Sequence, residues 1–218
     1  MERLQAEAAR WEARFRHLPR PWIPVIVGGS SGPYTFGRQA ARRLAAQATE
    51  FAQTRGGSLL VTTSARTAPA ALQELSRRIA APAFIYHWQQ DDLNNPYYAY
   101  LGLADELIVT ADSISMLSEA CATRKPVHMF DLGTGRRAMS RGTVGGNNDR
   151  RLAAWLYRGL MRWGPLRLSR DITLVHDQLI REGRADWLGQ PGSAGAPLPP
   201  QDIDRAVARV RALLAGAG

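Results

Sequence analysis

The chain has 218 residues, of which 45% are hydrophobic, and a formal net charge of +9. This length fits one α/β domain with additional helices, and no apolar run approaches the roughly 18 residues that a membrane-spanning helix requires. The first residues are amphipathic and charged, unlike a secretory signal. A single cysteine, Cys121, excludes an intramolecular disulfide and argues against a cysteine-based zinc site. These features favour the reducing cytoplasm as the location of the protein.

The positive charge is concentrated in one segment. Nine arginines and one acid, Asp149, lie between Thr134 and Arg170, so this segment carries +8 of the net charge of +9. If the charge attracts an anionic partner, we expect that partner near this segment rather than over the whole surface.

Apolar runs alternate with helical patterns as far as Phe130. A first helix is expected over residues 2–17, with Leu4, Ala8, Trp11 and Phe15 on one stripe. Strands are expected over residues 22–27, 58–63, 84–88, 106–111 and 127–130, and helices between them over residues 35–55, 68–80, 95–104 and 113–123. Nearly continuous apolar strands that alternate with helices are typical of a parallel sheet covered on both faces.

The pattern changes after Phe130. Residues 132–148 are rich in glycine and predict a loop, residues 189–200 predict a flexible linker, and helices are expected over residues 149–163, 169–182 and 202–214. The chain is therefore divided into an interdomain-type helix (1–20), a Rossmann-like α/β core of about five or six parallel strands with helices on both faces (21–133), a basic loop with C-terminal helices (134–188), and a linker with a terminal helix (189–218).

The loop after the first strand, GGSSG over 28–32, is the first candidate for a binding site, because ligands of such sheets bind at the carboxyl ends of the strands. Glycines allow the backbone to approach a phosphate, and the next helix, expected from about Thr35, would add its N-terminal amides. The alternative is a turn that needs glycine for its geometry alone. The loop lacks both the P-loop lysine and a full G-x-G-x-x-G, and no acid ends the second strand, so a P-loop nucleotidase and an NAD site are disfavoured.

Hydroxyl groups and an arginine follow the second strand. Thr63, Ser64 and Arg66 lie where they would meet a diphosphate, and arginine suits bidentate phosphate binding. The alternative is that Ser64 or Thr67 caps the next helix and Arg66 is a surface residue.

Aromatic residues follow the third strand. Tyr86 and Trp88 are candidates for stacking on a base, whereas Tyr97 is expected to pack against the sheet edge. The adjacent Asp91 and Asp92 are expected to be solvated rather than to bind a metal.

The loop after the fourth strand opens a helix with small polar residues. Asp112, Ser113 and Ser115 place backbone amides and hydroxyls at the strand ends, and Glu119 lies further along the helix, where a carboxylate can accept both hydroxyls of a ribose. The alternative is an ordinary capped amphipathic helix. Cys121 is expected to be a small buried residue rather than a nucleophile.

The segment ADELIVTADSISMLSEACATRKPVHMF resembles the donor-site segment of GT-B glycosyltransferases of the MurG type. The resemblance implies that Glu119 holds the ribose of a nucleotide sugar and that the amides facing its diphosphate belong to Ser113 and Ile114. A GT-B enzyme has two Rossmann-like domains, and this chain begins in what resembles the interdomain helix. We therefore expect the acceptor-binding domain to be missing from this chain or to be a partner chain.

A longer resemblance is to the family named for the plant mitochondrial-fission protein "elongated mitochondria". It rests on GGSSGPYTF, LLVTTSARTAP, NNPYYAYLGLADELIVTADSISMLSEA and RKPVHMF, which occur in this order over about Val25–Phe130. The resemblance implies a glycosyltransferase-like protein that takes a UDP- or GDP-type nucleotide sugar and an envelope-type acceptor without a metal. The alternative is a non-catalytic GT-B-like scaffold that binds protein partners, and a weaker third interpretation is another Rossmann-like nucleotide enzyme.

No catalytic residue, metal or cofactor is assigned. The residues assigned to substrate binding either follow a strand or belong to the segment that resembles the donor site. They are Gly28, Gly29, Ser30, Ser31, Thr63, Ser64, Arg66, Tyr86, Trp88, Asp112, Ser113, Ile114, Ser115 and Glu119.

The helix expected over residues 149–163 has an apolar stripe that includes Trp155 and Trp163, with arginines beside it. Such a helix can lie on an anionic membrane surface, which would make the protein peripheral on the inner membrane, or it can pack on the missing domain. No nucleic-acid-binding module is recognisable. A homodimer through the first helix or an exposed face of the domain is a further expectation.

Overall fold

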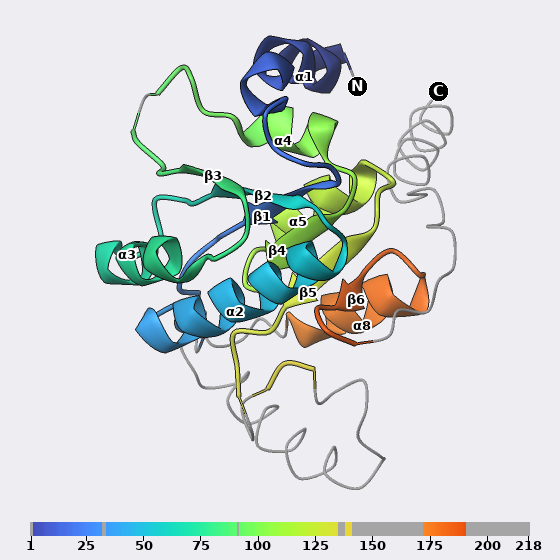
Figure 1. The fold of residues 1–218 in the computed structure, drawn as a ribbon. Helices are drawn as coiled ribbons and strands as arrows, with labels where there is room; N and C mark the ends of the chain where they lie inside the picture. Colours follow the sequence, from blue (N-terminus) through green and yellow to red (C-terminus); the bar gives the residue numbers. More distant parts are fainter. Residues whose placement is uncertain (1, 32–33, 91, 135–137, 141–171, 191–218) are drawn as a thin grey trace, which may run out of the picture.

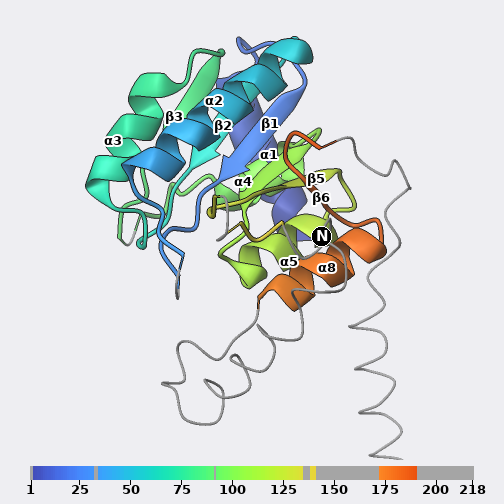
Figure 2. The same ribbon diagram turned by 90° about the horizontal axis from the view of Figure 1, so that it is seen from below.

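A computed structural model describes residues 2–31, 34–90, 92–134, 138–140 and 172–190. These residues form a six-stranded parallel sheet with helices on both faces (Figures 1 and 2). The predicted Rossmann-like α/β class is confirmed.

The strands lie in the order β3-β2-β1-β4-β5-β6. Their bounds are Trp22–Ile26 (β1), Ser58–Thr62 (β2), Ala83–Tyr86 (β3), Leu107–Thr110 (β4), Val127–Phe130 (β5) and Asp186–Trp187 (β6). The helices are Glu2–Phe15 (α1), Arg38–Thr54 (α2), Pro69–Arg78 (α3), Tyr97–Leu103 (α4), Ile114–Ala122 (α5) and Thr173–Arg181 (α8).

The elements expected as far as Phe130 are all present, with ends that differ by a few residues. The helix expected from Thr35 begins at Arg38, because Gly37 is its N-cap and the preceding residues form a loop. β6 was not predicted, since two residues carry no periodicity; it pairs with His128 and Met129 of β5. The helices expected over 149–163 and 202–214, the linker over 189–200 and most of the loop over 132–148 lie outside the described residues.

The chain reverses its order across the sheet between β1 and β4. After β1 it passes outward to β2 and β3, and then it returns to place β4 on the other side of β1. We call this place the switch point. In open parallel sheets the crevice for a ligand lies there, outside the carboxyl ends of the two central strands.

The helices cover the two faces of the sheet with different side chains. On one face, α2 and α3 pack on β1 and β2, and α2 contributes Leu44, Ala48 and Ala52, which are spaced to lie on one stripe and are fully buried. On the other face, α4, α5 and α8 pack against β4, β5 and β6.

α1 lies on α4 at the edge of this second face (Figure 1). Its Trp11 and Phe15 are buried, and the Phe15 ring lies 5.2 Å from that of Phe84 and 5.7 Å from that of Tyr100. The two helices approach closely at Gly102, where an added Cβ would lie 2.7 Å from the carbonyl oxygen of Leu4. The predicted apolar stripe of the first helix is thus confirmed as the part of α1 that packs on the domain. None of the described helices is both long and apolar enough to cross a membrane.

We predict that Phe15→Ala lowers the free energy of unfolding by about 3–5 kcal/mol, because a buried aromatic ring would be replaced by a cavity. The measurement is equilibrium unfolding in urea. Leu93→Ala is the control, since Leu93 is 91% exposed, and it should change stability by less than about 0.5 kcal/mol. A small loss for both variants would show that α1 does not contribute to the core.

Candidate functional site at the carboxyl ends of the central strands

Gly28 is the point where the loop after β1 touches the loop after β4. Its amide donates a hydrogen bond to Thr110 Oγ1 at 2.8 Å. A Cβ on Gly28 would lie 2.5 Å from Asp112 Oδ2, so the carboxylate rests against the bare Cα. Any side chain at this position would displace Asp112, and glycine is therefore required by contact rather than by turn geometry alone.

The loop after β2 closes over the same glycines. Ser64 Oγ donates a hydrogen bond to the carbonyl of Gly28, and Thr67 Oγ1 donates to the same oxygen at 3.2 Å. The suggestion that Ser64 or Thr67 caps the next helix is wrong: α3 begins after Ala68, without a side-chain cap and with a proline in its first turn. Ala68 is the N-cap of α3, so Ser64 and Thr67 precede the helix and both hydroxyls instead bind the loop after β1.

Gly29 lies beneath the backbone of Arg66. Its φ is +144°, and an added Cβ would lie 2.3 Å from the carbonyl oxygen of Arg66. The position therefore accepts only glycine, because of both its backbone conformation and the lack of space for a side chain. The two glycines together let three loops meet within van der Waals contact at the switch point.

Asp112 is a buried acid in this contact. Its side chain is 0% exposed, and its Oδ2 lies 3.1 Å from Nη1 of Arg66, whose side chain is 42% exposed. The Thr110 hydroxyl and the backbone amide of Gly29 also favour the charged form of this carboxylate. Burial raises the pKa of the Asp112 carboxyl, and the hydrogen bond from the Thr110 hydroxyl and the Arg66 charge oppose that shift.

The N-terminus of α5 adjoins Asp112. Ser113 is the N-cap residue, but its side chain makes no capping hydrogen bond, and its hydroxyl lies instead 3.3 Å from that of Ser115. The amides of Ile114 and Ser115 belong to the first turn, in which helical amides have no partner within the helix. The helix dipole adds partial positive charge at this end, which favours an anion.

Ser30 and Ser31 shape the rest of the loop after β1. Ser30 Oγ accepts a hydrogen bond from the amide of Phe36 at 3.1 Å, and Ser31 pairs with Tyr34 through two backbone hydrogen bonds. The Ser30 hydroxyl therefore holds the entry to α2 in place in this structure.

The aromatic candidates after β3 lie in different surroundings. Thr63 Oγ1 accepts a hydrogen bond from the Trp88 amide at 3.0 Å, and the Trp88 side chain is 37% exposed. Tyr86 instead donates to Asp92 Oδ2 at 2.6 Å. We expected Asp92 to be solvated, but it accepts this hydrogen bond. Of the two aromatic residues, Trp88 is the one that contacts the loop after β2.

Glu119 is an exposed residue on α5, and its Oε2 accepts a hydrogen bond from the Tyr97 hydroxyl at 2.8 Å. Tyr97 packs on the core of this face, but it also has a polar contact that its sequence position did not reveal. Cys121, two residues later, is buried at 3% exposure, as predicted for a small core residue.

The predicted site residues thus form one central cluster and several outliers. Gly28, Gly29, Ser64, Arg66 and Asp112 contact one another directly. Ser113, Ile114 and Ser115 follow this cluster in the chain. Tyr86 and Glu119 instead form hydrogen bonds with Asp92 and Tyr97, outside the cluster. Sequence reasoning did not assign Thr67, Thr110 or Tyr97 to the site. Thr67 and Thr110 lie beside the ends of strands, and this position was a signal that could have identified them. Tyr97 carried no such signal.

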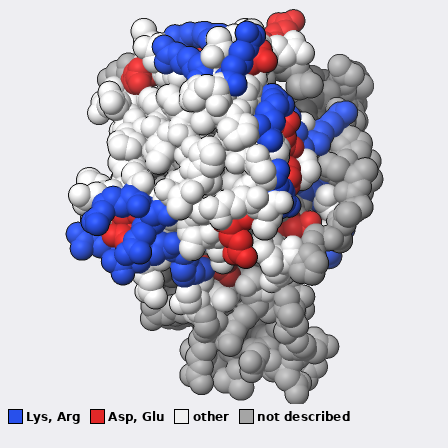
Figure 3. All heavy atoms as spheres, in the orientation of Figure 1, with Lys and Arg blue, Asp and Glu red and all other residues white. Residues whose placement is uncertain are grey.

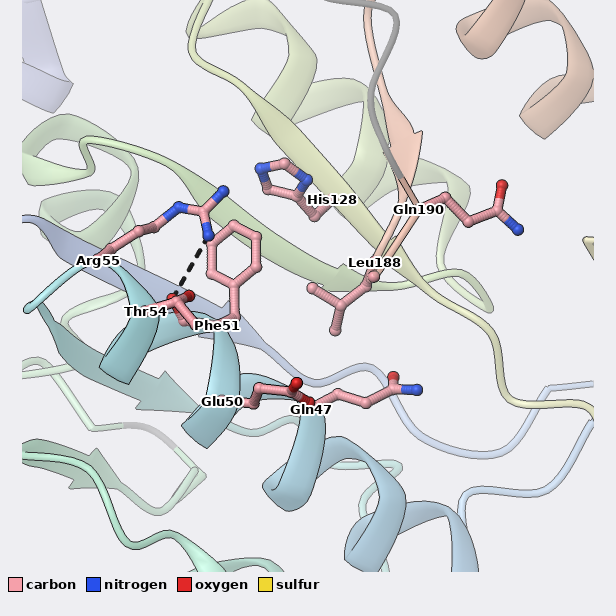
Figure 4. A pocket seen from close by; sticks show the side chains of 9 residues that line it. Gln47, Glu50, Phe51, Thr54, Arg55, His128, Leu188 and Gln190 are labelled. Atoms are coloured by element: carbon pink, nitrogen blue, oxygen red, sulfur yellow. Dashed lines mark hydrogen bonds between the residues drawn. The ribbon is translucent and has the colours of Figure 1, made fainter.

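A cavity of about 540 Å³ lies elsewhere, between α2 and the β5–β6 side of the sheet (Figure 4). Its lining includes Gln47, Glu50, His128 and Leu188. The imidazole of His128 and the guanidinium of Arg55 both bind the carboxylate of Glu106, at 2.9 and 2.7 Å, so both groups are already paired. Burial lowers the pKa of His128, and Glu106 opposes that shift. Glu50 adds negative charge, so this cavity would attract an anion less strongly than the switch point would.

Charged side chains are grouped on the face seen in Figure 3, with a wide uncharged area between the groups. Arg42 and Arg78 both pair with Glu74, at 2.6 and 3.0 Å. Among the described residues, no group of three or more His, Cys, Asp or Glu side chains is arranged to hold a metal ion.

A family model and a curated relative point to the same family. The model of the family described as Mitochondrial fission ELM1 matches residues 1–145. The mitochondrial fission protein ELM1 of Arabidopsis thaliana is 31% identical over 126 residues, which cover 58% of this chain and 29% of that protein. An uncharacterised protein of Rickettsia prowazekii is 29% identical over 129 residues, 59% of this chain and 36% of that protein. The matches thus span about a third of these relatives, and no solved structure matches.

We predict that Asp112→Asn becomes more stable relative to the wild type as the pH rises. The folded-state pKa of Asp112 is raised above its ordinary value of 3.8. The protonated carboxyl therefore contributes fully to the stability of the wild type below pH 3.8, and this contribution is lost as the pH rises and the buried carboxyl ionises. The measurement is the difference in free energy of unfolding between pH 4 and pH 8. Glu50→Gln controls for the loss of one carboxylate from the surface, and a constant difference for Asp112→Asn would contradict the prediction.

Proposed function

The chain belongs to the mitochondrial fission ELM1 family, and we propose that it binds a nucleoside-diphosphate sugar as the donor-binding domain of a glycosyltransferase-like protein. The observation that carries the proposal is the contact between Gly28 and Asp112 at the switch point, where the loops after β1, β2 and β4 meet. The fold alone supports many functions, so the proposal rests on the chemistry of this place.

The groups at the switch point suit a diphosphate. Gly28 and Gly29 present backbone without side chains, α5 presents its first amides, and Arg66 presents a guanidinium that is 42% exposed. Amides and a guanidinium stabilise phosphate oxygens, and they would do so most strongly as charge develops on a leaving diphosphate. Asp112 would hold Arg66 in position from the buried side.

The rest of the nucleotide would lie along α5 and β3. Glu119 follows Ser113 by six residues, about 9 Å along the helix at 1.5 Å per residue, and would bind the ribose. Trp88 is exposed beside the loop after β2 and is the candidate to stack on the base. The proposed acceptor is a hydroxyl of an envelope-type molecule, bound by a domain or partner chain outside the described residues.

The second candidate is a scaffold that binds a protein partner and no nucleotide. It is favoured by the name of the Arabidopsis relative, which is a mitochondrial fission protein. The two candidates differ in one measurable property, because the scaffold has no need of an anion site at Gly28.

We predict that one of UDP, GDP, ADP, CMP and dTDP stabilises the protein selectively. A ligand at 100 times its Kd should raise the free energy of unfolding by about 2.7 kcal/mol, which thermal shift and titration calorimetry detect. Glu119→Ala should abolish the selective stabilisation. If no nucleotide binds at millimolar concentration, the scaffold is the better account.

The double variant Arg66→Ala with Asp112→Asn should weaken nucleotide binding by about tenfold or more, since it removes a charge-assisted hydrogen bond to phosphate. Changing both residues leaves no buried carboxylate unpaired, so loss of binding will not reflect unfolding. Arg42→Ala, an arginine on α2 that pairs with Glu74, is the matched control and should bind as the wild type does. Equal affinity for all three proteins would exclude Arg66 from the site.

A further inference from the structure

Glu119 and Tyr97 form a pair on the surface between α4 and α5. The Tyr97 hydroxyl lies 2.8 Å from Glu119 Oε2 in an exposed hydrogen bond. Glu119 Oε1 has no partner among the described residues. The pair therefore presents one free carboxylate oxygen next to a phenolic oxygen.

The direction of this hydrogen bond is fixed by protonation. Burial and the contact with Glu119 raise the pKa of Tyr97, so its hydroxyl keeps its proton throughout the physiological range. The proton is donated to the carboxylate, and the phenolic oxygen keeps its lone pairs. Each residue can thus accept one more hydrogen bond, and the two acceptors lie side by side.

Tyr97 is held in place by its surroundings. It is the first residue of α4, and its amide donates to Asn95 Oδ1 at 3.0 Å. Its ring packs edge-on against that of Tyr98, with 5.3 Å between ring centroids, and against the core between α4 and α5. A hydroxyl fixed in this way holds the Glu119 carboxylate in one orientation before any ligand arrives.

We propose that Tyr97 and Glu119 together form a receptor for the two neighbouring hydroxyls of a ribose, and that Tyr97 determines the selectivity for ribonucleotides over deoxyribonucleotides. This inference rests on the proposed nucleotide site. One ribose hydroxyl donates to Glu119 Oε1, and the other donates to the Tyr97 oxygen. A deoxynucleotide would leave one of these acceptors without a donor, which costs affinity.

The test compares UDP and GDP with their 2′-deoxy and 3′-deoxy forms by titration calorimetry on the full chain. The wild type should prefer the ribonucleotide by about tenfold over each deoxy form. Tyr97→Phe should lose most of its preference over one deoxy form and keep it over the other. Glu119→Gln should weaken the preference over both deoxy forms, because it changes the acceptor for one ribose hydroxyl and also the group that orients the Tyr97 hydroxyl.

Tyr98→Phe is the matched control, since it removes a neighbouring hydroxyl from the same helix without touching Glu119. It should bind as the wild type does, and the melting temperatures of both phenylalanine variants should agree. If Tyr97→Phe weakens all nucleotides equally and keeps both preferences, the role of Tyr97 is structural and the inference fails. If none of UDP, GDP, ADP, CMP and dTDP binds the wild type, the proposed function fails and this inference fails with it.

Discussion

The contact between Asp112 and Gly28 is the constraint on which the rest of the site depends. It joins the loop after β4 to the loop after β1 across the switch point, where no backbone ladder continues. The absence of a side chain on Gly28 leaves room for the carboxylate, and the carboxylate in turn fixes Arg66 at 3.1 Å. Arg66 carries the loop after β2 over Gly29. One buried acid thus sets the relative position of three loops from both halves of the sheet.

A buried acid at this position costs stability unless its charge is compensated. Arg66 supplies that compensation from a half-exposed position, so its guanidinium faces both the acid and the solvent. An arriving phosphate would meet the same guanidinium on its open side. This arrangement explains how an anion site can be built next to a carboxylate. The cavity near His128 is a poorer candidate, because Arg55 and His128 are both paired with Glu106.

Much of the fold could be predicted because burial on both faces makes the strands continuous apolar runs. Leu107–Thr110 and Val127–Phe130 are readily recognised in the sequence for this reason, whereas Asp186–Trp187 is too short to show any period. The strand order also escaped prediction, since local patterns do not say which side of β1 receives β4. It was this order that brought Gly28 and Asp112 together.

The candidate site was predicted less completely than the fold. Position after a strand was enough to select Ser64, Arg66 and Asp112. It could not reveal that Ser64 binds Gly28 rather than capping a helix, because the two residues are 36 positions apart in the sequence. Tyr97 was missed because its hydrogen bond spans 22 residues and two helices. Contacts between side chains that are distant in the sequence cannot be recognised from one sequence alone.

The measurement that tests the central claim most directly is a titration of the ¹⁵N-labelled chain with UDP and GDP, followed by backbone amide chemical shifts. The account predicts that one nucleotide shifts the amides of residues 28–31, 64–66 and 113–115 together, in a saturable manner. Shifts confined to residues 47–55 and His128, around the cavity beside α2, would contradict it. So would the absence of any shift at the switch point at saturating nucleotide.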